Sequence, residues 1–273
     1  MGEIDPAFIQ DPEYRPELKP IEPDEIPVIS LSVSSPSDIE RILSEIGDAC
    51  QKWGFFQVIN HGVSLELRQK VEKLAKEFFN QPLEEKLKVK RNEVYPVGYY
   101  DGEHTKNVRD WKEVFDFLLK DSTMLPVSFD PDDKELRTLT NQWPEQYPPE
   151  FREVCQEYAR EVSNLGYKLF ELVSQGLGLP ADRLIGYFKD QLSLCRLNYY
   201  PPCPAPHLAL GVGRHKDATA LTILFQDDVG GLEVKRKSDG EWIPVRPFPG
   251  AYIINVGDVL QHCRFGPTTN IRA

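Results

Sequence analysis

The spacing of hydrophobic residues divides the chain into regions with a helical pattern and a final region with a strand pattern. Apolar residues recur at helical spacing over 36–53, within 64–91 and over 149–179, as on the buried face of an amphipathic helix. From Leu192 onward the period falls to two, and the segments become short and rich in β-branched and aromatic residues. The pattern therefore predicts long helices followed by a sheet structure.

Residues with strong terminal preferences set the expected ends of these helices. Ser35 is a suitable N-cap and Pro36 a suitable first residue for a helix that extends to about position 53. Pro82 predicts that 64–91 forms two helices, because proline fits a first turn but not a helix interior. The long helix over 149–179 is expected to end at Gly176 or Gly178.

Short segments between turn signals have the composition of strands. Two of them, 26–32 and 54–63, lie early in the chain, and the others follow the long helix at 194–200, 221–226, 231–236, 241–246 and 251–257. The glycine-bearing stretches Asp227–Gly231 and Ser238–Gly240 are predicted to be hairpin turns with positive φ. This spacing predicts an antiparallel barrel or jelly roll.

Loop composition separates the two regions. Residues 121–147 are acidic and contain Pro126, Pro131 and Pro144, so they are predicted to be a linker loop. Residues 1–25 contain five prolines and little periodicity, which predicts an extended arm.

Composition excludes several classes of protein. The formal charge of -11 argues against a nucleic-acid partner, because such binding needs a basic face. No apolar run approaches the roughly 20 residues that span a bilayer, so no membrane segment is expected. The five cysteines form no C-x-x-C pair, as in reduced proteins. A cytoplasmic protein is predicted.

The segment "GRHKD" carries the first candidate chemistry. On an extended backbone His215 and Asp217 leave the same face and can reach one small cation. With a distant second histidine they would form the facial triad of non-haem Fe(II) sites. The alternatives are an ordinary exposed turn pair and a zinc hydrolase site, although the latter lacks a third ligand and a general base nearby.

The context of this segment carries a family resemblance. "NYYPPCPAPHLALGVG" precedes it and "AYIINVGD" follows it, while "DACQKWGFFQVINHGV", "FFNQPLEEK" and "DWKEVFDF" lie in the first half. The arrangement resembles the plant 2-oxoglutarate- and Fe(II)-dependent dioxygenases. The resemblance implies an α+β fold, with an amino-terminal helical cap over 26–120 and a double-stranded β-helix (jelly-roll) core over 148–261.

The resemblance also implies roles for individual residues. His215 and Asp217 would be iron ligands, and Asn198 and Tyr200 would contact 2-oxoglutarate. The family reaction converts 2-oxoglutarate and O₂ to succinate and CO₂ while a second, small substrate is hydroxylated, desaturated or cyclised. Ascorbate is the expected reductant, and a monomer is the expected state.

Several aromatic residues are candidates for an apolar substrate pocket, with burial in the core as the alternative. They are Tyr99, Tyr100, Phe115, Phe117 and Phe225. His61 follows a predicted strand and is expected to be structural rather than part of the site.

The end of the sequence departs from the family pattern. After Asp258 the family continues with tryptophan and asparagine, the second iron-binding histidine and an R-x-S pair that holds 2-oxoglutarate, but this sequence has none of them. His262 lies in the wrong register for that histidine. With suitable codons, a one-base shift turns "FGPTTNIRA" into VW(T/S)NDKYKS, which resembles the expected continuation.

We therefore expect 262–273 to be an out-of-frame tail and the last core strands to be missing. The alternative to a working dioxygenase is thus a truncated isoform that is catalytically inactive and binds at most a weak ligand or partner.

Overall fold

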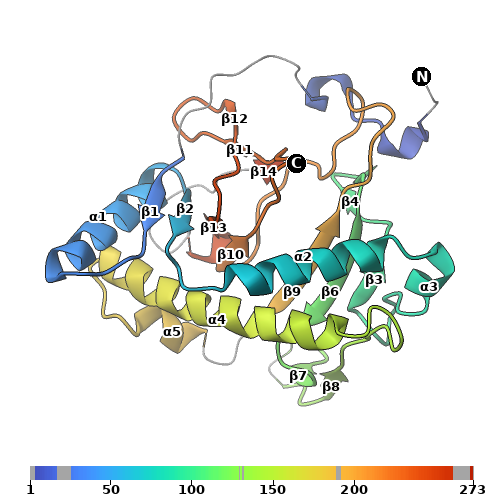
Figure 1. The fold of residues 1–273 in the computed structure, drawn as a ribbon, viewed down its shortest axis with the longest axis horizontal. Helices are drawn as coiled ribbons and strands as arrows, with labels where there is room; N and C mark the ends of the chain where they lie inside the picture. Colours follow the sequence, from blue (N-terminus) through green and yellow to red (C-terminus); the bar gives the residue numbers. More distant parts are fainter. Residues whose placement is uncertain are drawn as a thin grey trace.

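The computed structural model describes residues 4–16, 26–128, 130, 132–188, 192–260 and 271–272. Two long helices, α2 (Leu65–Phe79) and α4 (Phe151–Gly176), run side by side across the strands (Figure 1). The helix α1 (Pro36–Lys52) packs against α4 and β2. The amphipathic pattern places the apolar faces of these helices on one shared core.

Helix ends follow the residues that predicted them. The helix α1 begins at Pro36, and the carboxylate of Asp38 accepts the backbone N–H groups of Ser34 and Ser35 at 2.9 and 2.8 Å. The helix α4 ends at Gly176 as expected. Pro82 differs slightly, since it precedes the first residue of α3 (Leu83–Leu87) instead of lying in its first turn. One more short helix, α5 (Arg183–Tyr187), follows α4.

The strands form three main sheets. The first has the order β1 (Val28–Ser30), β2 (Phe55–Ile59), β13 (Tyr252–Val256) and β10 (Leu221–Leu224). The second has the order β3 (Gly98–Tyr100), β6 (Glu113–Leu118) and β9 (Leu194–Tyr199), and the third β12 (Trp242–Pro244), β11 (Glu233–Lys235) and β14 (Ile271–Arg272). All neighbours are antiparallel except β1 and β2, which are parallel.

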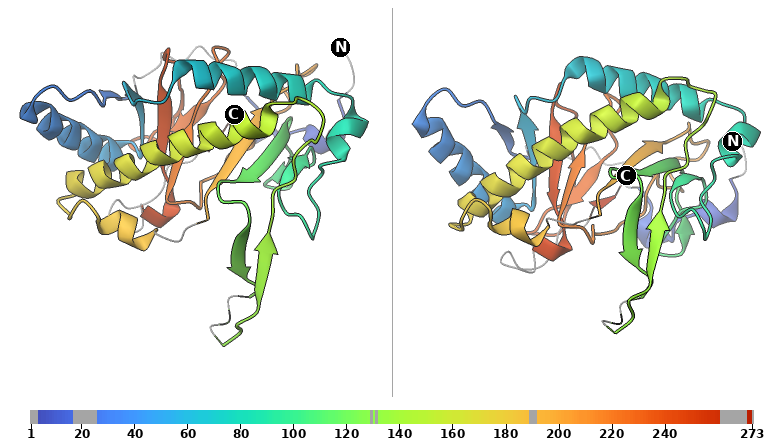
Figure 2. Two further views of the ribbon diagram at one scale, coloured as in Figure 1. Left: turned by 60° about the horizontal axis from the view of Figure 1, so that its bottom comes forward. Right: turned by 90° about the horizontal axis from the view of Figure 1, so that it is seen from below.

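Two of these sheets combine strands from both sides of the predicted linker. Strand β2 pairs with β13, and β6 pairs with β9. The cap and the core are therefore one continuous packing unit. The linker region also differs from the predicted loop, because β7 (Thr123–Pro126) and β8 (Leu136–Leu139) form a hairpin there, which projects from the body (Figure 2).

One of the two predicted hairpin turns joins paired strands. Gly240, with φ +78°, lies in the turn that links β11 to the antiparallel β12, as predicted. Gly230 and Gly231 also have the expected positive φ of +78° and +109°. However, they connect β10 to β11, which belong to different sheets, so the prediction of a hairpin at this position was wrong.

The amino-terminal arm is folded where it is described. Two short 3₁₀ turns, Pro6–Phe8 and Pro12–Tyr14, follow each other. The ring of Phe8 packs edge-on against Trp111 with centroids 4.8 Å apart, and its face lies under the Arg109 guanidinium. The small hairpin of β4 (His104–Thr105) and β5 (Val108–Arg109) therefore supports this arm.

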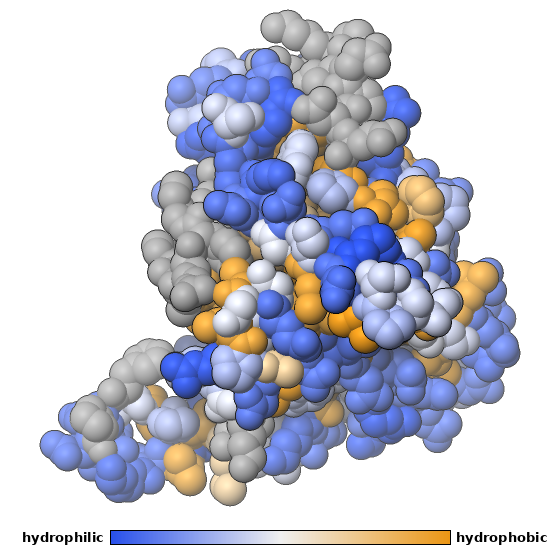
Figure 3. Space-filling view, turned by 90° about the vertical axis from the view of Figure 1, so that its left-hand side faces the viewer, coloured by the Kyte–Doolittle hydropathy of each residue, from blue (hydrophilic) through white to orange (hydrophobic). Residues whose placement is uncertain are grey.

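The pleat of β9 separates core side chains from the opposite face. Cys195, Leu197 and Tyr199 pack against the main core beneath the helices, so the alternate residues Arg196 and Asn198 point to the other side. On the side of the molecule that carries α1, hydrophilic residues cover most of the surface, and hydrophobic residues show between them (Figure 3). Within the described ranges, no helix has the length and apolar character needed to cross a membrane.

Candidate metal centre

His215 and Asp217 face each other, as the sequence predicts. Nε2 of His215 lies 3.4 Å from Oδ1 of Asp217, and their side chains are 35% and 16% exposed. Both residues lie between β9 and β10. An imidazole nitrogen and a carboxylate oxygen thus converge at a partly open position.

The remaining ring nitrogen of His215 is fixed by the backbone. Nδ1 lies 3.0 Å from the carbonyl oxygen of Gly213, to which it donates a hydrogen bond. This bond orients the ring and directs Nε2 toward Asp217. Burial alone would lower the pKa of His215, but the contacts with Asp217 and Gly213 outweigh it and raise the pKa above its usual value.

The remaining oxygen of Asp217 is fixed by two strands. Oδ2 accepts hydrogen bonds from Oγ1 of Thr222 at 2.7 Å and from Nδ2 of Asn255 at 2.6 Å. These two donors are direct partners in the β10–β13 ladder. Burial would raise the pKa of Asp217, but the hydrogen bonds from His215, Thr222 and Asn255 lower it. The other oxygen, Oδ1, faces Nε2 of His215.

Gly257 allows the end of β13 to approach this segment closely. A Cβ atom at Gly257 would lie 2.1 Å from the carbonyl oxygen of Thr219 and 3.0 Å from that of Asp217. The backbone N–H of Asp258 donates to the Asp217 carbonyl at 2.8 Å. Only glycine fits here, so the motif "VGD" anchors the backbone of Asp217.

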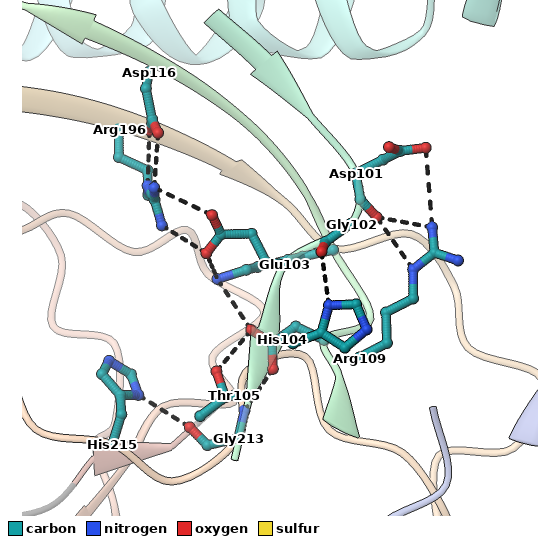
Figure 4. Close-up of polar contacts among 12 residues, drawn as sticks. Asp101, Gly102, Glu103, His104, Thr105, Arg109, Asp116, Arg196, Gly213 and His215 are labelled. Carbon is teal, nitrogen blue, oxygen red and sulfur yellow. Dashed lines mark hydrogen bonds and ion pairs between the residues drawn. The ribbon is translucent and has the colours of Figure 1, made fainter. Parts of the chain in front are cut away.

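A network of charged side chains borders the site. The guanidinium of Arg196 binds Asp116 in a bidentate manner, with two bonds of 2.7 Å, and donates to Glu103 at 3.0 Å (Figure 4). Burial would raise the pKa of Glu103, but Arg196, Lys112 and Arg91 hold it below its usual value. Arg196 is therefore held rigidly beside Asn198 on the same face of β9.

The predicted 2-oxoglutarate contacts are accessible. Asn198 lies near the end of β9 and Tyr200 just beyond it, and both side chains are exposed. Their strand pairs with β6, where Val114 faces Asn198 across the ladder. Among the described residues, neither of these two forms a hydrogen bond or ion pair with His215 or Asp217.

Most of the predicted pocket residues have another role. Tyr99, Phe115 and Phe117 are buried in the core beneath the helices, which corrects the pocket prediction. Phe225 packs against the same core, 4.4 Å from the guanidinium of Arg68. Tyr100 stacks on Arg91 at 3.8 Å. The strand pleat explains this outcome, because odd-numbered positions of β6 point toward the helices.

The other histidines of the described chain do not join the metal centre. His61 is structural, as predicted: Nε2 bonds to the Gly250 carbonyl at 2.8 Å, and Nδ1 accepts the N–H of Val63 at 3.1 Å. His262 lies outside the described residues. Among the residues that are described, no cluster of three or more His, Cys, Asp and Glu side chains could hold a metal ion.

Sequence reasoning missed the residues that hold the side chain of Asp217. Thr222 and Asn255 are polar, and they lie 5 and 38 positions away from it. Asn255 lies inside the quoted motif "AYIINVGD", so its polar side chain in an apolar strand was an available signal.

Two family models match the chain. The model described as non-haem dioxygenase in morphine synthesis N-terminal matches residues 26–146, and the 2OG-Fe(II) oxygenase superfamily matches residues 191–271. Naringenin,2-oxoglutarate 3-dioxygenase of Matthiola incana is 35% identical over 262 residues, which cover 94% of this chain and 70% of the relative.

The chain belongs to the plant 2-oxoglutarate- and Fe(II)-dependent dioxygenases. Another member of this dioxygenase family, gibberellin 20 oxidase 2 of Oryza sativa subsp. indica, is 39% identical over 242 residues, or 87% of this chain and 60% of the relative.

Solved structures of related dioxygenases agree. The crystal structure of JOX2 in complex with 2OG, Fe, and JA has a TM-score of 0.80 at 30% identity, and it covers all of this chain and 75% of that one. The 2-oxoglutarate complex of dioxygenase for auxin oxidation 1 from Arabidopsis thaliana has a TM-score of 0.70 at 28% identity, covering 91% and 86%. These matches confirm the expected double-stranded β-helix fold and the expected enzyme family.

The described donors fit Fe(II) as part of a facial triad. His215 and Asp217 offer one nitrogen and one oxygen, and the second atom of each side chain is already engaged elsewhere. Dioxygenases of this family use Fe(II) and 2-oxoglutarate. When bound, the iron supplies the redox chemistry with O₂.

Proposed function

We propose that this dioxygenase oxidises a small specialised metabolite, with His215 and Asp217 as two of its iron ligands. The observation that carries the proposal is the 3.4 Å distance between Nε2 of His215 and Oδ1 of Asp217. In each side chain the other polar atom forms a hydrogen bond, Nδ1 of His215 with Gly213 and Oδ2 of Asp217 with Thr222. The two side chains are prepared to bind a cation without reorganisation, since their rotamers are already fixed.

The residues near the site suggest how the organic ligands bind. We propose that Asn198 and Tyr200 hold 2-oxoglutarate through the amide and the phenol, since both lie exposed at the end of β9. The substrate would then occupy the face of β6 and β9 opposite the helices. Named relatives act on naringenin, flavanone and gibberellin, which supports a small ring-containing substrate. Ascorbate would serve as reductant, and the protein would work as a cytoplasmic monomer.

A second candidate function concerns this chain in particular. Within the described residues, His215 and Asp217 would supply two protein ligands, and no cluster there adds a third. Two ligands hold Fe(II) weakly. The second candidate is therefore an inactive form that binds ligands weakly.

One experiment separates the two candidates. Succinate release from 2-oxoglutarate is measured with Fe(II), ascorbate and O₂ for this chain and for a version whose residues from 262 onward follow the unshifted frame. We expect turnover only in the second protein. Turnover by this chain would show that it completes its own site, and His262→Ala would then identify the third ligand. If neither protein releases succinate, the proposed activity is wrong.

The matched controls are His215→Ala and His104→Ala in the active protein. His104 is an exposed residue of the β4–β5 hairpin, and among the described residues its side chain bonds only to the nearby Gly102 carbonyl. His215→Ala should abolish turnover, whereas His104→Ala should leave it unchanged.

A further inference from the structure

The loop that leads to His215 depends on other segments for its conformation. Residues 201–214 contain no helix or strand, and within them the backbone makes one hydrogen bond, from Leu208 to Ala205. Outside partners hold the rest: Trp111 donates its backbone N–H to Leu210 at 3.0 Å and its indole N–H to Pro201 at 2.9 Å. The conformation of this loop is therefore determined by its hydrogen bonds to other segments.

Asp110 makes the contact nearest to the metal ligand. Its Oδ1 accepts the backbone N–H of Gly213 at 3.0 Å, and the carbonyl of the same Gly213 binds Nδ1 of His215 at 3.0 Å. A single residue therefore connects the carboxylate of Asp110 to the imidazole. Figure 4 shows His215 directed at Gly213, which lies beside Thr105.

The environment of Asp110 makes this contact rigid. The side chain of Asp110 is only 1% exposed, and its Oδ2 accepts a hydrogen bond from Thr105 at 2.9 Å and lies 3.5 Å from Nζ of Lys112. All three neighbours are donors, so the two carboxylate oxygens of Asp110 accept from them together. A Cβ atom at Gly213 would lie 2.9 Å from Cβ of Thr105, so the loop is packed as well as bonded.

We propose that Asp110 is a positioning residue of the metal centre: it fixes the Gly213 peptide and, through it, the orientation of the His215 ring. The metal-binding part of this proposal rests on the proposed function, whereas the geometric part does not. Supporting groups of metal-ligating histidines typically change metal affinity by about 10–100-fold when they are removed.

The test compares Asp110→Ala with Glu113→Ala. Glu113 lies three residues away and also forms a buried ion pair, with Lys86, but it makes no recorded contact with residues 201–214. Hydrogen exchange of the peptide covering 211–217 is measured without metal, and the Mn(II) dissociation constant is measured by electron paramagnetic resonance. We expect Asp110→Ala alone to speed exchange at least tenfold and to weaken Mn(II) binding about tenfold.

Asp110→Asn is the conservative variant and distinguishes a local effect from loss of the fold. Its amide oxygen can still accept the Gly213 N–H, so this variant should keep most of the exchange protection that Asp110→Ala loses. Equal exchange in Asp110→Ala and Glu113→Ala would overturn the proposal. Absence of Mn(II) binding in the unmodified chain would contradict the proposed metal site for this chain, while the exchange result would still decide the role of Asp110.

Discussion

The side-chain amide of Asn255 lies 2.6 Å from Oδ2 of Asp217, while Nε2 of His215 lies 3.4 Å from the other oxygen of that carboxylate. The two oxygens therefore have separate roles. One is held by β13 through Asn255 and by β10 through Thr222, and the other remains available to a cation. Such a division favours monodentate binding, because the engaged oxygen cannot also turn toward the metal.

Removing Asn255 should weaken metal binding more than it weakens the fold. We expect Asn255→Ala to raise the Mn(II) dissociation constant about tenfold, since Asp217 can then rotate. The control is Asn141→Ala, which removes hydrogen bonds to both backbone groups of Leu118 away from the site. Equal affinities of the two variants would contradict the role of Asn255.

Gly257→Ala should disturb the site through the backbone. The added Cβ would meet the Thr219 carbonyl at 2.1 Å, which forces β13 away from the Asp217 segment. We expect a loss of about 1–3 kcal/mol or more in the free energy of unfolding, measured by urea titration. Gly186→Ala in α5 is the control, because nothing lies within 4 Å of its added Cβ. A neutral Gly257→Ala would show that this approach can relax.

The ion pair of Arg196 and Asp116 predicts a non-additive pair of mutations. The Asp116 side chain is 3% exposed, so among the described residues Arg196→Met would leave this buried carboxylate with one cationic partner, Arg91 at 3.6 Å. We expect a loss of about 3 kcal/mol, as for other buried pairs that lose one partner. Adding Asp116→Leu should restore much of this stability, and additive losses in urea unfolding would contradict the interpretation.

His61 should make stability depend on pH. Burial lowers its pKa in the folded protein, and Arg68 and Lys168 lower it further. The unfolded chain then binds a proton more readily near its ordinary pKa of about 6.5, so the contribution of His61 is present above that pH and is lost as the pH falls. The difference in unfolding free energy between the unmodified protein and His61→Gln should shrink from pH 7.5 to 5.5. His104→Gln serves as control, and a constant difference for His61→Gln would refute the prediction.

Local features of the sequence were sufficient for many elements. Ser35 and Pro36 predicted the start of α1, and Gly176 the end of α4, because caps act within one helical turn. The β9, β10 and β13 segments followed from their period of two. The H-x-D alternation likewise brought His215 and Asp217 together, since two positions apart on an extended chain share a face.

Other features required the tertiary structure. The pocket prediction was wrong for Tyr99, Phe115 and Phe117, because composition does not say which face of a strand meets the helices. The predicted hairpin after β10 was wrong for a related reason. Glycines in a turn indicate a positive φ, but they do not determine which strands pair with each other.

The sequence by itself determined the caps, the strand periods, the convergence of His215 and Asp217 and, through its motifs, the dioxygenase family. Only the tertiary structure decided that β2 lies beside β13 and that Asp110, 105 positions before His215, supports its loop. The physical reason is range: dihedral preferences and side-chain alternation act over a few residues. By contrast, the partners of buried polar groups are chosen by how the whole chain packs.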